Sequence, residues 1–342
     1  MRKIGLMLAG ALLIASFSAV PAGAGKKHIP EWIRPAVNYL HGAGYIDKSS
    51  FKANRPMRRA EFKSLMRKAF GPGHFNKTTG NVKAGEVGRA LVKALGLSDA
   101  AAALKTATSP DGWKPETGRY FGTEIVAREL GLRRDRPTSE DSLEASASEA
   151  MHQGDIAYAV HRAKTAPSLY AADVLRSFGL PNYGDTRRKV IQYAMSLVGT
   201  PYVWAGEWPT RTPSSYPYGA QVHGGFDCSG FVWYVLQAKS ASYRPAGRPY
   251  KGWSIPQRSS YDMAGGTKDR ISYKKLRAGD IVFFAPGGKK AKAGDVYHAG
   301  LYMGRGWMIH SSGSRAGVSI TTIGPGSWWH DQIAWGRRVI TS

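Results

Sequence analysis

The N-terminal half of the sequence contains three similar segments, at residues 57–69, 82–94 and 151–163, which align with one another without gaps. Each segment has an acidic residue at its fifth position and apolar residues at its sixth and tenth positions. An acidic residue followed by apolar residues one helical turn apart is typical of an amphipathic helix that has the acid in its first turn. Repetition of such a unit is typical of stacked helical modules. The segments therefore predict an all-α repeat domain over residues 25–165.

The first residues of the chain have the layout of an export signal. Arg2 and Lys3 precede an uncharged run over residues 4–19, and small residues at 22–24 form a cleavage-site pattern. This is the arrangement of a secretory signal peptide, and the run is short for a permanent membrane anchor. We expect residues 1–24 to be removed, no transmembrane segment in the mature chain, and an extracytoplasmic protein, secreted or in the cell wall.

The formal net charge of +24 predicts attraction to a polyanion without saying which one. Nucleic acid is the least favoured partner, because the basic residues are scattered and no known nucleic-acid-binding module accompanies them. Export favours the anionic polymers of a cell envelope instead. The sequence therefore predicts no nucleic-acid partner.

Cys228 is the only cysteine of the chain, so it has no partner for an internal disulfide bond. Asp227 precedes it as a good helix N-cap, and apolar residues follow at helical spacing. Cys228 therefore falls in the first turn of a predicted helix, where free backbone N–H groups and the helix dipole favour the thiolate. The same N–H groups would stabilise an oxyanion beside the sulfur. We interpret Cys228 as a nucleophile rather than as an inert buried side chain.

Two of the nine histidines stand at matching places in a predicted β-hairpin, where His298 begins one apolar run and His310 ends the next. A three-residue turn between the runs would pair Met303 with Trp307. Gly300 would then lie opposite His310, and both imidazoles would point from one face of the sheet. One histidine would act as a general base for the thiol while the other orients it. A two-residue turn would place the imidazoles on opposite faces.

Five motifs in the second half of the chain, taken in order, resemble those of the NlpC-type family of cell-wall peptidases, a compact branch of the papain-like fold. The motifs are Gly199-Thr200-Pro201-Tyr202-Val203-Trp204-Ala205-Gly206, Asp227-Cys228-Ser229-Gly230-Phe231, Leu276-Arg277-Ala278-Gly279-Asp280-Ile281-Val282-Phe283-Phe284, His298-Ala299-Gly300-Leu301-Tyr302 and Met308-Ile309-His310. The resemblance covers about residues 185–340 and implies an α+β domain with an antiparallel sheet and a nucleophile helix. It also implies hydrolysis of γ-D-glutamyl links in peptidoglycan stem peptides.

By position, the resemblance makes Cys228 the nucleophile, His298 the general base and His310 the residue that orients the base. A wall-binding scaffold with an inactive peptidase fold is an alternative, although a scaffold has no need of all three residues. A second alternative is an amidase or acyltransferase with the same nucleophile. Sequence does not separate hydrolysis from transfer, because both pass through one acyl-enzyme.

Three further residues, Tyr202, Asp227 and Ser229, fall where some members of the family bind the end of the substrate, including a free amino terminus. The resemblance therefore implies a substrate-binding role for each of them. Two of them also have a simpler explanation, because Asp227 suits a helix N-cap and Tyr202 suits a packing aromatic residue. We keep both interpretations open.

The first of the three repeated segments resembles the S-layer homology module, whose repeats form a small three-fold helical bundle and often bind secondary wall polymers. Arg59-Ala60-Glu61 matches three positions of the Thr-Arg-Ala-Glu-like turn of that module, whereas Ala84 and Gln153 replace the arginine in the other two segments. The resemblance implies anionic secondary wall polymers as ligands of the repeats. A purely structural helical domain is an equal alternative.

Prolines and a change of composition mark a boundary after the repeats. We expect a linker over residues 166–184 and the peptidase domain over residues 185–342. Two insertions relative to the compact family pattern, at 207–225 and 239–270, are expected to wall the substrate cleft. The sequence has no glycine-rich phosphate loop and no Cys/His cluster at metal spacing, so we expect neither a cofactor nor a metal.

Overall fold

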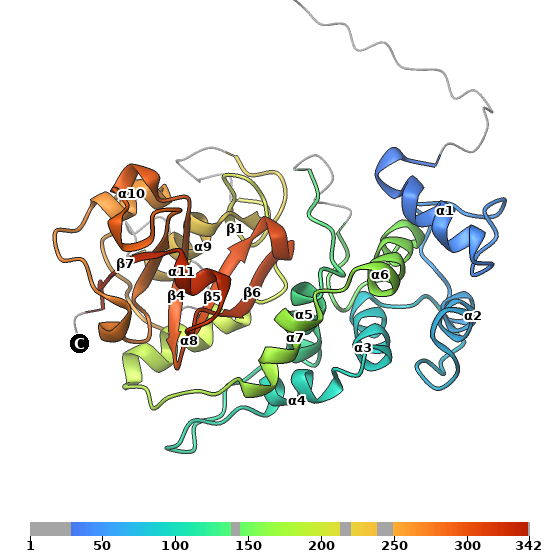
Figure 1. The fold of residues 1–342 in the computed structure, drawn as a ribbon, viewed down its shortest axis with the longest axis horizontal. Coiled ribbons are helices and arrows are strands. Elements are labelled where there is room, and N and C mark those ends of the chain that lie inside the picture. Colours follow the sequence, from blue (N-terminus) through green and yellow to red (C-terminus); the bar gives the residue numbers. More distant parts are fainter. Residues whose placement is uncertain (1–28, 138–143, 213–219, 238–248, 341–342) are drawn as a thin grey trace, which may run out of the picture.

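The computed structural model describes residues 29–137, 144–212, 220–237 and 249–340. A helical part from the first half of the chain lies beside a part from the second half in which helices pack on an antiparallel sheet (Figure 1). Among these residues, the structure has no helix that is both long and apolar enough to cross a membrane. The predicted signal peptide, residues 1–24, lies outside the described residues.

Short helices make up the first part. Their bounds are α1 (Arg34–Gly42), α2 (Arg59–Phe70), α3 (Ala84–Ala94), α4 (Ser98–Thr106), α5 (Phe121–Glu129), α6 (Gln153–Thr165) and α7 (Leu169–Asp173). The three repeated segments correspond to α2, α3 and α6, so the predicted helices are confirmed. Their early acids lie in the first turns, where the carboxylates of Glu61 and Glu86 accept the backbone N–H groups of Arg58 and Lys83, both at 3.0 Å.

Backbone hydrogen bonds join the three repeated segments in a closed cycle. The N–H of Met57 donates to Met151 O at 3.1 Å, that of Met151 to Val82 O at 2.9 Å, and that of Val82 to Met57 O at 2.9 Å. These are the first residues of the three segments, so equivalent positions meet at one point. Side-by-side packing in a row would not close such a cycle. The segments are therefore arranged about a common axis.

The second part is built on a five-stranded sheet in the order β6-β5-β4-β3-β7, with every neighbouring pair antiparallel. Its strands are β3 (Ile281–Phe284), β4 (His298–Gly304), β5 (Trp307–Ser312), β6 (Gly317–Thr322) and β7 (Ile333–Arg337). The remaining elements are β1 (Glu207–Trp208), β2 (Gly225–Phe226), α8 (Asp185–Ser196), α9 (Cys228–Leu236), α10 (Ser260–Gly265) and α11 (Trp328–Asp331). The expected antiparallel α+β architecture is confirmed.

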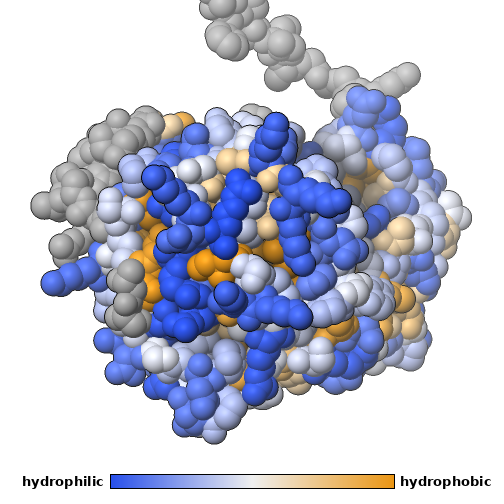
Figure 2. Space-filling view, turned by 60° about the vertical axis from the view of Figure 1, so that its left-hand side comes forward, coloured by the Kyte–Doolittle hydropathy of each residue, from blue (hydrophilic) through white to orange (hydrophobic). Residues whose placement is uncertain are grey.

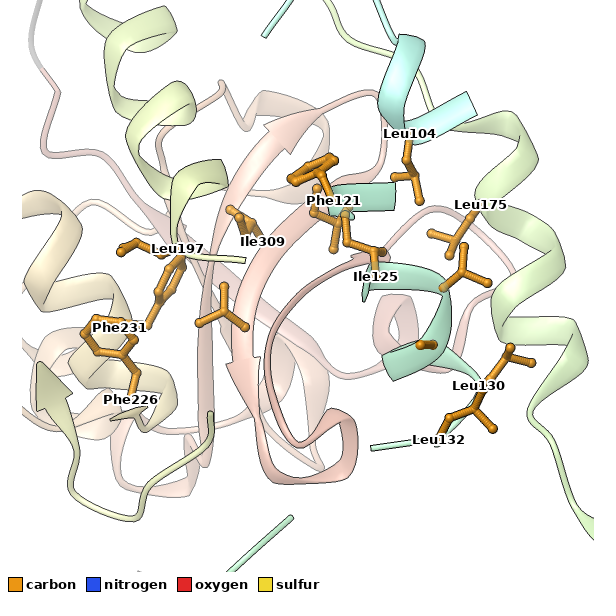
Figure 3. Packing of buried hydrophobic residues seen from close by; sticks show 14 of the residues in the cluster. Leu104, Phe121, Ile125, Leu130, Leu132, Leu175, Leu197, Phe226, Phe231 and Ile309 are labelled. Atoms are coloured by element: carbon orange, nitrogen blue, oxygen red, sulfur yellow. The ribbon is translucent and has the colours of Figure 1, made fainter. Parts of the chain in front are cut away.

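Helix α9 packs against β4 and β5, and all of its residues are buried. Its apolar side chains leave no polar face, which is typical of a helix covered on all sides. Phe231 and Phe226 lie on one side of the sheet residue Ile309 in the close view of the core (Figure 3). The first turn of α9 is therefore held against the sheet by the burial of the rest of the helix.

Helix α5 connects the two parts, and sequence analysis did not identify it. Its Glu129 is fully buried against β6, where it pairs with Arg315 at 2.9 Å and accepts hydrogen bonds from Ser319 and Thr321. The neighbouring guanidinium of Arg128 donates to backbone carbonyl oxygens of the second part, including Gly199 at 2.8 Å. Buried charges require such partners, so these contacts hold α5 on the sheet.

The buried hydrophobic cluster is continuous through both parts (Figure 3). Residues 166–184, expected as a linker, contain α7 and the 3₁₀ helix η3 (Val174–Ser177), and Leu175 and Leu180 of this stretch are buried in the cluster. The molecular face in Figure 2 is largely hydrophilic, and its hydrophobic residues are visible mainly in a hollow between projecting side chains. On this face the apolar residues are thus mostly covered.

The close approach of α4 and α5 gives a prediction for stability. A methyl group at Gly122 would overlap the carbonyl oxygen of Ala101, whereas one at Gly118 would meet nothing within 4 Å. Because the obstacle is backbone, Gly122→Ala should lower the free energy of unfolding by about 1–3 kcal/mol. Chemical denaturation of the full chain measures this loss. Gly118→Ala is the control, and equal stability of the two variants would contradict the packing.

Candidate active site

Cys228 is the first residue of α9, and this N-terminal end of the helix faces β4. The carboxylate of Asp227 caps the helix by accepting the N–H of Gly230 at 2.5 Å, so the predicted N-cap is confirmed. The Cys228 side chain is only 9% exposed. The backbone N–H groups of Ala299 and Ser229 act on its thiol. The sulfur therefore lies beside β4, next to the residue that follows His298.

The N–H of Ser229 at the helix end lowers the pKa of the Cys228 thiol, as expected, but burial outweighs this effect in the free protein. The pKa of the Cys228 thiol is raised to about 11, first by burial and then by the negative charge of Asp227. The N–H groups of Ala299 and Ser229, and the charge of Arg258, lower the pKa but do not offset the burial. The thiol is therefore protonated at neutral pH, and a base has to take its proton during any reaction.

The two histidines of the predicted hairpin form a hydrogen-bonded pair. His298 Nε2 and His310 Nδ1 are 2.7 Å apart, with the ring planes nearly perpendicular. His298 is 7% exposed and His310 is fully buried. Burial lowers the pKa of His298 to about 3. The pKa of His310 is held well below its usual value, mainly by burial and also by its neighbours His298 and Arg315. Both imidazoles are therefore neutral at physiological pH.

The hairpin reaches this arrangement with a shorter turn than the predicted one. Trp307 pairs with Gly304 rather than with Met303, so the turn has two residues, and the register then shifts between Gly304 and Tyr302. Tyr302 pairs with Met308, as a three-residue turn would require. A bulge at Met303 thus restores the alignment that the shorter turn would have broken. The imidazoles share one face, as predicted, for a different reason.

Gly300 leaves the room that the histidine pair occupies. A methyl group at this position would lie 3.1 Å from His310 Cβ and 3.0 Å from Met308 Sδ. Both distances are shorter than ordinary van der Waals contact. A side chain at residue 300 would therefore push β5 and its imidazole away from His298.

Two of the predicted substrate residues, Asp227 and Ser229, are engaged by Arg258. Its guanidinium donates to Asp227 Oδ1 at 3.2 Å and to Ser229 Oγ at 3.0 Å, and it also pairs with Glu207. These groups line a cavity of ≈ 460 Å³. Sequence analysis placed Arg258 only in a loop expected to wall the cleft. In the structure it neutralises the carboxylate next to the nucleophile helix.

The third predicted substrate residue, Tyr202, is half-buried beside the same helix end. Burial raises the pKa of its hydroxyl, and the neighbouring acidic groups Cys228, Asp227 and Asp135 act in the same direction. The Tyr202 ring and the Asp135 carboxylate both approach Gly313, at 3.6 Å and 2.9 Å from the position of a methyl group there. Asp135 belongs to the helical part, and sequence analysis missed it because nothing local distinguishes it from a surface acid.

Within the part of the chain that the structure describes, no group of three or more His, Cys, Asp or Glu side chains is arranged to hold a metal ion. Of the two predicted insertions, residues 213–219 and 239–248 lie outside the described residues. The described site thus consists of a thiol, two neutral imidazoles, an arginine–carboxylate cluster and a tyrosine. This set suits nucleophilic chemistry at a carbonyl carbon.

Comparison with known proteins places this region in a family. A family model described as "NlpC/P60 family" matches residues 199–337. The bifunctional muramidase/DL-endopeptidase CwlT of Bacillus subtilis (strain 168) is 32% identical over 154 residues, which are 45% of this chain and 37% of CwlT. The gamma-D-glutamyl-L-lysine dipeptidyl-peptidase of the same organism is 32% identical over 139 residues, which are 40% of this chain and 36% of that protein.

A solved structure of an NlpC/P60 family protein from Bacillus cereus ATCC 10987 is 26% identical and has a TM-score of 0.33. The match covers 47% of this chain and 42% of that protein. This chain spans little more than a third of the length of each of the two B. subtilis relatives. The family assignment rests on the matched region: residues 199–337 are an NlpC/P60 family domain.

Proposed function

We propose that this protein is a secreted cysteine endopeptidase that hydrolyses peptide links, the γ-D-glutamyl links in particular, in peptidoglycan stem peptides. Cys228 is the nucleophile, His298 the general base and His310 the residue that orients the base. The observation that carries the proposal is the 2.7 Å contact between two buried, neutral imidazoles on β4 and β5, the two strands against which helix α9 is packed. The name of the dipeptidyl-peptidase, which specifies a γ-D-glutamyl link, and the DL-endopeptidase activity in the name of CwlT support the substrate.

The hydrogen bond between the histidines determines which ring nitrogen of each residue carries a hydrogen. For His298 to accept a proton from the thiol, its Nδ1 must be bare, so its Nε2 carries the hydrogen and donates to His310 Nδ1. His310 then carries its own hydrogen on Nε2, which is buried without a partner among the described residues. A buried N–H without a hydrogen-bond partner costs free energy. Its presence on His310 Nε2 therefore supports a functional role for this tautomer.

The reaction then proceeds by two acyl transfers. As Cys228 Sγ attacks the carbonyl carbon of the scissile amide, its proton passes to His298 Nδ1 and a tetrahedral oxyanion forms. Backbone N–H groups at the start of α9 stabilise this oxyanion. Collapse breaks the C–N bond, with the proton of His298 passing to the leaving amine. Water, deprotonated by the same imidazole, hydrolyses the thioester and regenerates the thiol.

A protonated thiol and a neutral base suit this sequence of steps. Proton transfer occurs during attack, so a preformed thiolate–imidazolium pair is not needed. An amidase or an acyltransferase would use the same steps with another bond or another acceptor. A catalytically inactive scaffold is disfavoured, because burial of two imidazoles in contact is costly and gives a scaffold no advantage.

For the helical part, we propose S-layer homology-like repeats in a domain over residues 25–165, followed by a boundary at 166–184. The closed cycle of backbone hydrogen bonds through Met57, Val82 and Met151 supports the repeats. Binding of an anionic wall polymer is less well supported. Arg59, the motif arginine, is engaged by Glu86 at 2.9 Å and by Thr79 O at 2.7 Å.

Digestion of purified peptidoglycan tests the proposed function. The full chain should release fragments whose masses correspond to cleavage within the stem peptides, at γ-D-glutamyl links. Cys228→Ala should reduce the release by at least about 10³-fold, since the nucleophile is absent. Cleavage that survives the substitution would end the catalytic assignment. Fragments cut only at the sugar–peptide bond would indicate an amidase instead.

The room left by Gly300 gives a second prediction. Gly300→Ala should lower kcat/KM on a stem peptide by about 100-fold, because displacement of a catalytic group by an ångström costs that much. The loss should occur without unfolding, as checked by circular dichroism. Gly294→Ala is the matched control, since a methyl group there meets nothing within 4 Å. Wild-type activity of Gly300→Ala would contradict the assigned geometry.

The charge of Arg258 gives a third prediction, which needs no substrate. Removal of the guanidinium in Arg258→Met leaves Asp227 uncompensated beside the thiol, so the pKa of Cys228 should rise further. Alkylation by iodoacetamide at a fixed pH should then slow by roughly tenfold, in proportion to the thiolate population. Arg258→Lys keeps the charge and should slow the reaction less. Faster alkylation of Arg258→Met in folded protein would refute the role of this charge.

A further inference from the structure

An indole covers the histidine pair from the side of α11. The ring of Trp329 lies over His298 with centroids 4.8 Å apart and planes at 34°, and it meets His310 edge-on at 5.3 Å and 90°. The same indole packs on Phe284 of β3 at 4.9 Å. One aromatic side chain thus contacts both imidazoles and a neighbouring aromatic residue of the sheet.

The short helix that carries Trp329 is held at several points. Ser327 caps it by accepting the N–H of His330 at 3.1 Å, and the His330 ring contacts Ile323 O through Nδ1 at 3.1 Å. The other side of the His330 ring meets Tyr273 edge-on at 4.6 Å. These contacts fix α11 on either side of the indole. Trp329 is therefore placed by the fold rather than by the histidines.

The neighbouring Trp328 has the opposite environment. It is 61% exposed and contacts the indole of Trp329 edge-on at 4.9 Å. The structure records no ring contact between Trp328 and either histidine among the described residues. The two tryptophans share a helix, a size and a chemistry, and they differ in their contact with the imidazoles.

We propose that Trp329 is a positioning residue, which keeps water from the His298–His310 hydrogen bond so that His298 stays neutral and oriented. The inference rests on the proposed role of His298 as the base. Stacking on a flat apolar face leaves an imidazole no room to rotate about its bond to Cβ. Exclusion of water also protects the hydrogen bond between the rings from competition and strengthens it.

The groups that face His298 come from several elements. Cys228 of α9 and His310 of β5 are neutral in the free protein, Tyr297 precedes β4, and the charge of Arg315 acts on His310. The low basicity of His298 comes from burial, the one cause that acts on it. Entry of water in place of the indole would stabilise the imidazolium, so the pKa of His298 would rise toward its ordinary value of about 6.5.

Removal of Trp329 should lower the activity at mildly acidic pH. Once the pKa of His298 has risen, the ring carries a proton at mildly acidic pH and is unable to accept another from the thiol. The acid limb of the kcat/KM profile should therefore move to higher pH when Trp329 is removed. A purely structural role for Trp329 would lower activity at every pH and leave the limb in place.

The test uses the full chain with isotope-labelled histidine, in Trp329→Ala, Trp329→Phe and the control Trp328→Ala. Nuclear magnetic resonance follows the ring signals of His298, assigned by comparison with His298→Gln, as the pH is changed. In Trp329→Ala the titration midpoint of His298 should rise by about two pH units or more, and the acid limb of kcat/KM on a stem peptide should rise with it. Trp329→Phe should give a smaller rise and Trp328→Ala none.

An unchanged midpoint in folded Trp329→Ala would overturn the inference, as would an equal rise in Trp328→Ala. If Trp329→Ala does not fold, Trp329→Phe serves as the test, because it keeps an aromatic ring in place. A rise in the titration midpoint of His298 in Trp329→Phe would support the inference, and an unchanged midpoint would overturn it. The titration does not require turnover. Failure of the proposed function, seen as intact peptidoglycan with wild-type protein, is therefore distinguishable from failure of this inference.

Discussion

A hydrogen bond between two buried imidazoles imposes the main constraint on this structure. Two rings 2.7 Å apart cannot both be charged, and burial keeps both neutral in the free protein, so one ring has to donate and the other to accept. The strands that carry them have to be adjacent and in a fixed register. Gly300 has to lack a side chain, and a flat apolar group, Trp329, covers the rings. The contact between the imidazoles depends on each of these features.

The edge of the sheet at β6 depends on the helical part. Arg128 and Glu129 of α5 are buried ionisable side chains whose partners lie on the segments around Gly199 and Arg315, and burial raises the pKa of Glu129 to about 7. The segment that begins at Gly199 leads directly to Tyr202, whose N–H donates to Ala316 O at 3.3 Å. Loss of either charge would leave the other groups of the cluster unpaired. The helical part therefore supports the wall of the site as well as having a core of its own.

Much of this arrangement could be predicted from local patterns. Glu61 and Glu86 at the start of amphipathic runs identified α2 and α3, and Asp227 before apolar residues identified α9, because caps and helical spacing are encoded within a few residues. The meeting of His298 and His310 followed from strand parity. The bulge at Met303 could not be predicted, because no residue type signals it. The predicted turn was one residue too long, and the bulge compensated for this error.

Features that depend on distant parts of the chain were not accessible from sequence. Glu129 looks like a surface acid on a short helix, and its burial is decided by β6, far along the chain. The pKa of Cys228 was expected to fall because the helix end is a local effect, whereas burial of α9 is a tertiary effect and is larger. Arg258 reaches the site from a loop and Trp329 from the short helix α11, and no periodicity in the sequence describes the path of either segment.

The central claim is that Cys228, activated by the histidine pair, is the residue that attacks the substrate. Its most direct test is titration of the full chain with a stem-peptide analogue that carries a chloromethyl ketone at the scissile carbonyl. Peptide mapping by mass should find one equivalent attached to Cys228, with peptidoglycan digestion lost in the same proportion as the label is gained. Digestion that persists with Cys228 fully labelled, or that is lost while the label sits elsewhere, would contradict the account.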